Sequence, residues 1–149
     1  MKNEKKLLGY CGLYCGRCMG YTEVIAKAAN NLKKVVEKYK FDQTAKNVFP
    51  KELKEYDKFY KVLSFMTGLK CPGKCRTGDD TFSTCEIRRC CKGKRYYACY
   101  ECDIFQTCDK LKSFMGGIHY NSCIKNLKAI NKMGLDDWIK SGKKVWYWD

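Results

Sequence analysis

Cysteine is unusually frequent in this chain: twelve of its 149 residues are cysteines, about 8%. Such a proportion is typical of small proteins that are held together by disulfides or metal ions as well as by an apolar core. The length suits one small domain with a core of modest size. The sequence therefore predicts a small single domain, residues 1–149, whose fold depends on its cysteines.

The state of these thiols depends on the compartment, because cytosolic cysteines are kept reduced whereas secreted ones oxidise. The N-terminal residues do not form a secretion signal, since polar residues and glycines interrupt the apolar run before Arg17. No stretch approaches the roughly 18 apolar residues of a membrane helix. We therefore expect a soluble, cytoplasmic protein without a membrane partner, whose thiols are available to metal. Disulfides are the alternative, which the even number of cysteines also permits.

Two regions of the chain show the apolar spacing of amphipathic helices, residues 21–68 and residues 121–141. In the first region Thr22 is the expected cap of one helix, and Pro50 is the expected start of a second. In the second region Gly134 is the expected end of the main helix, with a short turn after it. These regions predict a mainly α fold.

Eleven of the twelve cysteines lie outside the helical regions, in residues 11–18 and 71–108, and Cys123 lies in the second helical region. The apolar periodicity disappears between residues 71 and 108, where glycines lie among the cysteines. We therefore expect an irregular, cysteine-rich region that is organised by metal.

Zinc suits these cysteines, because it accepts four thiolates and because two ligands separated by two to four residues can share one ion. Four such pairs occur: Cys15 and Cys18, Cys71 and Cys75, Cys85 and Cys90, and Cys99 and Cys102. Four pairs are enough for two sites. One ion is expected to bind the three cysteines of the run CGLYCGRC, namely Cys11, Cys15 and Cys18, together with Cys71 or Cys75. The other is expected to bind Cys85, Cys90, Cys99 and Cys102.

An iron-sulfur cluster is the alternative cofactor. The C-x3-C-x2-C spacing of CGLYCGRC also occurs in radical enzymes that hold a four-iron cluster, but those enzymes need most of a barrel of about 250 residues. The common ferredoxin spacings are absent from the sequence.

Several segments resemble a known family: CGLYCGRC, CPGKC, CEIRRC, CYEC and NLKAINKMGLDDWI. They are similar, over nearly the whole chain, to the small cysteine-rich proteins of domain-of-unknown-function family 3795. The resemblance implies a metal-binding protein and assigns no reaction. Its implied metal ligands are Cys11, Cys15, Cys18, Cys71, Cys75, Cys85, Cys90, Cys99, Cys102 and Cys108. Cys91 and Cys123 look like additions to the family pattern.

The chain is strongly basic, with a formal net charge of +14. Two zinc ions held by four thiolates each would lower this to about +10, which still favours an anionic partner such as nucleic acid. The segment IRRCCKGKRYYACY interleaves cations that can neutralise phosphates with rings that can stack on bases. Its candidate nucleic-acid-binding residues are Arg88, Arg89, Lys92, Lys94, Arg95, Tyr96 and Tyr97. The alternative is that these cations balance thiolate charge and that the tyrosines cover a thin core.

The remaining candidates are weaker. His119 is the only histidine and is expected to be a surface or cap residue rather than a metal ligand. The tryptophans near the C-terminus are expected to dock on the core. No catalytic motif is present. The sequence therefore predicts a non-enzymatic zinc-binding module with a basic surface, the alternative being an iron-sulfur redox or electron-transfer protein.

Overall fold

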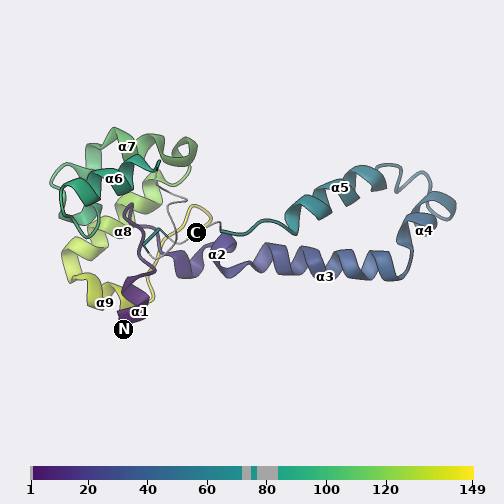
Figure 1. Ribbon diagram of the computed structural model, residues 1–149, viewed down its shortest axis with the longest axis horizontal. Coiled ribbons are helices and arrows are strands. Elements are labelled where there is room, and N and C mark those ends of the chain that lie inside the picture. The colour runs from purple at the N-terminus through teal and green to yellow at the C-terminus, as the bar shows by residue number, and fades with distance from the viewer. Residues whose placement is uncertain (1, 72–74, 77–83) are drawn as a thin grey trace. The chain divides into compact units, whose positions relative to one another are not determined.

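The computed structural model describes residues 2–71, 75–76 and 84–149, and these are mainly helical (Figure 1). No β-strand occurs among these residues. Their only β-type pairing is one isolated antiparallel bridge between Leu8 and Tyr14. The predicted mainly α class is confirmed. Part of the predicted cysteine-rich region, residues 72–74 and 77–83, lies outside the described residues. In the described part, every helix is too short or too polar to cross a membrane.

The chain divides into two compact units, which are described separately. Unit 1 comprises Met1–Arg17 and Pro72–Asp149, and unit 2 comprises Cys18–Cys71. The expectation of a single domain stays a prediction.

Unit 2 is a helical hairpin. Its helices are α2 (Met19–Thr22), α3 (Val24–Lys38), α4 (Phe41–Asn47) and α5 (Tyr56–Met66). Helices α3 and α5 lie side by side and run in opposite directions, with α4 in the connection between them (Figure 1). Ala29, Val36 and Leu63 form the buried contact of the two long helices. So small a core leaves much of each helix exposed.

The boundaries in unit 2 differ from the predicted ones. Thr22 does not cap α3, because its hydroxyl donates to the carbonyl of Cys18 and Glu23 adopts a left-handed conformation (φ 57°) in between. Residues 51–55 form turns, so α5 begins at Tyr56 and not at Pro50. Tyr56 is the first side chain of this segment to be buried, and it packs against the ring of Phe41. The packing of an aromatic side chain therefore sets the start of α5.

Unit 1 contains the other elements. They are α1 (Lys2–Lys5), η1 (Cys15–Arg17), α6 (Glu86–Gly93), η3 (Cys99–Glu101), η4 (Phe105–Thr107), α7 (Asp109–Ser113), η5 (Phe114–Gly117), α8 (Tyr120–Met133) and α9 (Leu135–Lys140). Helix α6 and the 3-10 turns lie inside the stretch that was expected to be irregular, so that expectation is wrong for residues 86–93. Ile87 and Cys91, one helical turn apart, supply the buried side of α6.

Helix α8 provides the apolar centre of unit 1. Leu127 and Ile130 of α8 are fully or almost fully buried, and Trp138 of α9 is completely buried. Gly12 approaches α8 so closely that a Cβ atom there would lie 2.7 Å from Cγ of Leu127. Its φ of +93° also favours glycine. The predicted end of α8 at Gly134 agrees with the structure.

Candidate metal centre

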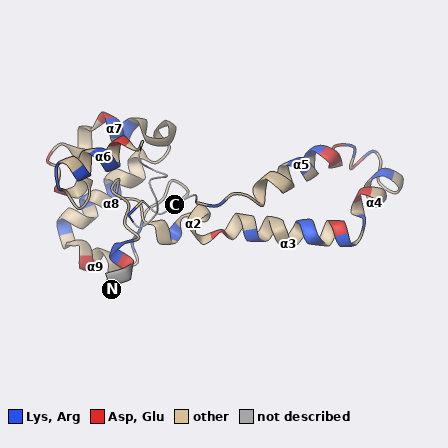
Figure 2. Cartoon of the chain, in the orientation of Figure 1, with Lys and Arg blue, Asp and Glu red and all other residues tan. Residues whose placement is uncertain are grey.

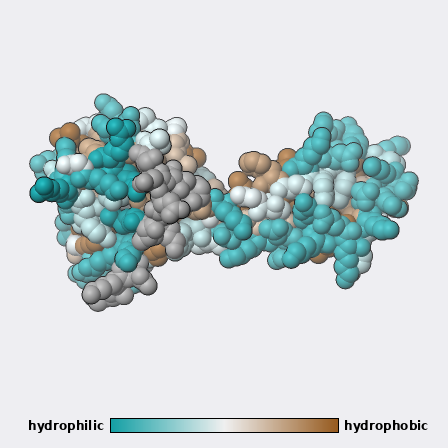
Figure 3. All heavy atoms as spheres, viewed as in Figure 1, coloured by the Kyte–Doolittle hydropathy of each residue, from teal (hydrophilic) through white to brown (hydrophobic). Residues whose placement is uncertain are grey.

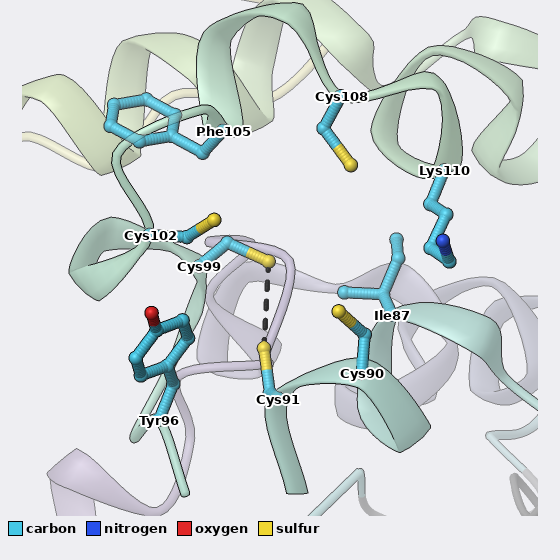
Figure 4. Close-up of a pocket in the computed structure, with 9 residues that line it drawn as sticks. All are labelled: Ile87, Cys90, Cys91, Tyr96, Cys99, Cys102, Phe105, Cys108 and Lys110. Carbon is cyan, nitrogen blue, oxygen red and sulfur yellow. Dashed lines mark hydrogen bonds between the residues drawn. The ribbon is translucent and has the colours of Figure 1, made fainter. Parts of the chain in front are cut away.

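Five cysteines line one pocket in unit 1. Cys90 and Cys91 come from α6, Cys99 and Cys102 from η3 and the residue after it, and Cys108 from the start of α7. Figure 4 shows their sulfur atoms pointing toward the same space. The remaining lining residues are Ile87, Tyr96, Phe105 and Lys110. The pocket thus combines thiols from three elements with largely apolar walls.

Cys91 and Cys99 make the closest contact in this pocket. Their Sγ atoms lie 3.6 Å apart, and both residues are buried. Two thiolates on one tetrahedral zinc ion lie about 3.8 Å apart, since each Zn–S bond is about 2.3 Å long. The Cys91–Cys99 pair therefore already has the spacing of one edge of a zinc tetrahedron.

The contact between Cys91 and Cys99 shifts the pKa values of the two thiols in opposite directions. The hydrogen bond with Cys99 lowers the pKa of Cys91 below its usual value, and the positive charges of Arg76 and Lys94 act in the same direction. The pKa of Cys99 is raised by its hydrogen bond to Cys91 and by burial. Either thiol of the pair can donate this hydrogen bond, so the contact suits a pair in which one of the two thiols loses its proton first.

The pocket contains three of the four cysteines that were predicted to share one ion. Cys90, Cys99 and Cys102 line the pocket together, as expected. Cys85 does not line it, and Cys91 and Cys108 do. The sequence pattern had set Cys91 apart as an addition. One feature of the sequence could have predicted that Cys91 lies in the pocket. It follows Ile87 by one helical turn, so a helix there would bury both side chains on the same side.

A second set of cysteines lies close to this pocket without lining it. A hydrogen bond between the Cys11 and Cys123 thiols raises the pKa of Cys11, and burial raises it further. Burial also raises the pKa of Cys75, and nearby Cys11 and Cys85 add to this effect. Cys123, which was not predicted as a ligand, is thus the partner of Cys11.

The remaining predicted ligands are divided between the units. Cys15 belongs to unit 1, where its N–H donates to the carbonyl of Leu7. Cys18 and Cys71 belong to unit 2, in which the Cys71 N–H donates to the carbonyl of Gly20. An ion shared by Cys11, Cys15 and Cys18 stays a prediction.

The side chains as placed do not enclose an ion. Among the residues that the structure describes, no group of three or more His, Cys, Asp or Glu side chains is arranged to hold a metal. Binding in the pocket therefore requires two more sulfurs to turn toward the Cys91–Cys99 pair. The donor set itself suits a thiophilic metal, because five thiols face a small cavity of about 20 Å³.

The predicted nucleic-acid-binding residues are only partly exposed. Arg88 is 5% exposed, so the expectation that it contacts phosphates is wrong for this conformation. The helical period places Arg88 on the buried side of α6 beside Cys91. The other four cations of the segment, Arg89, Lys92, Lys94 and Arg95, are exposed.

The two tyrosines of this segment take part in the fold. Tyr96 lines the cysteine pocket. Tyr97 donates its hydroxyl to the carbonyl of Lys5, and its ring lies 3.9 Å from the guanidinium of Arg76. Both tyrosines are half-buried, so only part of each ring is accessible for stacking on a base.

The histidine and the tryptophans also have defined positions. His119 is the N-cap residue of α8, which agrees with the cap position among the two that were expected, and it is buried among aromatic rings rather than at the surface. Burial lowers its pKa. Trp138 and Trp146 are buried as expected, whereas Trp148 is 43% exposed.

Comparison with known proteins supplies the family. The profile described as protein of unknown function (DUF3795) matches residues 7–113. The chain belongs to this family. The matched range contains all ten cysteines that were predicted as ligands, and it ends before Cys123 and α8. No curated protein and no solved structure matched the chain.

Proposed function

We propose that this protein binds zinc at the five-cysteine pocket of unit 1 and acts as a non-enzymatic binding module in the reducing cytoplasm. The supporting observation is the convergence of five thiols, two of which lie 3.6 Å apart, close to the spacing of two thiolates on one zinc ion. Cys91 and Cys99 would supply two ligands. Two of Cys90, Cys102 and Cys108 would supply the others.

A zinc ion with four thiolates would supply structural stability rather than catalysis, since such sites are closed to substrate. It would join α6, η3 and the start of α7, which are short elements with few apolar side chains of their own. The cavity of about 20 Å³ is also far smaller than the several hundred Å³ of a typical small-molecule site. These features favour a binding module over an enzyme.

The proposed partner is a nucleic acid or another polyanion. Helix α6 carries two pocket cysteines, and the exposed cations Arg89, Lys92, Lys94 and Arg95 lie on it or directly after it. An ion bound by Cys90 or Cys91 would therefore fix the position of this basic segment. A fixed array of cations loses less entropy on binding phosphates than a mobile one.

Metal analysis of the purified protein tests the zinc proposal. We expect about two zinc ions per chain in the wild-type protein, and about one fewer in Cys99→Ser. Ser122→Ala is the control, because it changes a buried side chain of α8 that does not line the pocket, and it should keep the metal content. Replacement of zinc by Co²⁺ should give the absorption bands of a tetrahedral thiolate site in the wild-type protein. Metal-free wild-type protein, purified with its thiols reduced, would contradict the proposal.

An iron-sulfur cluster is the second candidate. Five thiols line one pocket although no three of them, among the described residues, are arranged around a single ion. A cluster holds its cysteine ligands farther apart than one zinc ion does, and would tolerate this spacing. Protein purified without oxygen would then be brown and would contain iron and acid-labile sulfide in place of zinc.

A further inference from the structure

Helix α3 of unit 2 carries two separate apolar stripes. Ala29 and Val36 pack with Leu63 of α5, and Ala26 is buried on the same helix. A second stripe consists of exposed residues: Val24, Ala28, Leu32, Val35 and Tyr39. From Ala28 to Tyr39 its members are four, three and four residues apart, which is the heptad spacing by which one helix packs along another. The second stripe has no partner within unit 2.

Helix α5 also exposes apolar side chains beside its buried ones. Tyr56 and Leu63 point inward, whereas Phe59, Val62 and Phe65 are 44%, 57% and 73% exposed. Figure 3 shows apolar atoms at the surface of unit 2 near the end of α5. Large apolar groups grouped on a surface are typical of an interaction site.

The two exposed stripes lie on the same side of the hairpin. On the other side, Tyr60 of α5 donates a hydrogen bond to Glu37 of α3, and Lys33 lies 5.5 Å from the Tyr60 ring. Each residue turns 100° around its helix, which puts the exposed stripe of each helix on the side away from these contacts. Together the stripes form one surface, here called the apolar face: Val24, Ala28, Leu32, Val35, Tyr39, Phe59, Val62 and Phe65.

Lysines border the apolar face along both outer edges. The helical period places Lys27, Lys34 and Lys38 on the outer side of α3, and Lys58 and Lys61 on the outer side of α5. Figure 2 shows basic residues on both helices. Among the ion pairs of unit 2, whose residues are all described, only one involves these five lysines, the pair of Lys58 with Glu55. Unit 2 as a whole has eleven lysines against six carboxylates, a net charge of +5. The border is therefore positive.

We propose that the apolar face binds an amphipathic helix of a partner protein, one whose apolar stripe is flanked by Asp or Glu. The heptad spacing fits the side chains of a helix. The lysine borders fit acidic flanks and oppose a second copy of this chain, whose own lysines would meet them. An anionic lipid surface would match the charge, but nothing in lipid binding requires the heptad spacing.

The test uses the full-length protein and designed peptides of three heptads, measured by fluorescence anisotropy. The first peptide has Leu and Ile at the core positions and Glu at the flanks. The second has Lys at the flanks, and the third contains the residues of the first in scrambled order. We expect binding of the first peptide, weakened by salt, and at least about tenfold weaker binding of the other two.

Variants locate the binding site. Leu32→Ser combined with Val35→Ser removes two exposed side chains from the middle of the face, and should weaken binding by about tenfold or more. Val48→Ser is the control, because Val48 is 62% exposed but lies after α4, outside the face. Circular dichroism should show unchanged helix content in both.

Three results would overturn the proposal. The first is equal or absent binding of the glutamate-flanked and lysine-flanked peptides. The second is a wild-type dimer, detected by light scattering, that the Leu32→Ser/Val35→Ser variant dissociates. The third is sedimentation with phosphatidylserine vesicles that the same variant abolishes while no peptide binds.

Discussion

The side-chain amide of Asn126 forms two hydrogen bonds with the main chain of Val145, one in each direction. The amide nitrogen donates to the Val145 carbonyl at 2.9 Å, and the Val145 N–H donates to the amide oxygen at 2.8 Å. Asn126 is completely buried on α8. This pairing holds the C-terminal segment, which includes the buried Trp146, against α8.

Asn126→Leu should therefore destabilise unit 1. The change preserves size but leaves the polar groups of Val145 without their partners, at a cost of about 2 kcal/mol. For a chain of this length the melting temperature should fall by roughly 4–8 °C. Asn121→Leu, at an exposed position of the same helix, should leave it nearly unchanged. Equal melting temperatures for the two variants would show that the Asn126 pairing contributes nothing.

His119 should make stability depend on pH in the slightly acidic range. Burial lowers the pKa of His119 in the folded protein, so the unfolded chain binds a proton more readily. This contribution to stability is complete above the unfolded pKa of about 6.5 and is lost as the pH falls through the folded pKa. Melting temperatures of wild type should drop between about pH 7.5 and 5.5, and those of His119→Phe should drop less.

The titration of His119 can also be followed directly, because the chain has no other histidine. Its imidazole proton resonance in the NMR spectrum should titrate with a midpoint below 6.5. A midpoint at or above that value would contradict the burial of the ring among Phe114, Trp146 and Tyr147.

Cys15→Ser tests the second predicted zinc ion. If Cys11, Cys15 and Cys18 share an ion, this variant should lose about one equivalent of metal and become sensitive to protease near its N-terminus. A strong chelator should loosen the wild-type chain as a whole, because a site built from distant ligands forms only on folding. Unchanged metal content in Cys15→Ser would remove this ligand set. Metal-free native protein without titratable thiols would instead indicate disulfides.

The basic segment of α6 should contribute to binding of single-stranded oligonucleotides. Replacement of Arg89, Lys92 and Lys94 by Ser should reduce the slope of log affinity against log salt concentration by roughly two to three units. Lys125, Lys128 and Lys132 are exposed on α8, and their replacement by Ser gives a control with the same change of charge. Equal slopes for the two triple variants would place the phosphate contacts elsewhere.

The sequence by itself determined the helical class and the family. The apolar period of residues 25–39 and the glycine at position 134 are local signals, and they predicted most of α3 and the end of α8. The order and spacing of the cysteines likewise predicted membership of the family that the profile confirmed. These features depend on residues near each other in the chain, so they can be read without knowledge of the fold.

Only the tertiary structure decided which cysteines lie together. Cys91 meets Cys99 because α6 turns its buried side toward η3, and Cys11 meets Cys123 because Gly12 lets the chain approach α8. The burial of Arg88 has the same origin as that of Cys91. A short helix buries whichever side its neighbours cover. These neighbours come from distant parts of the sequence, so the spacing of nearby residues does not show which side will be buried.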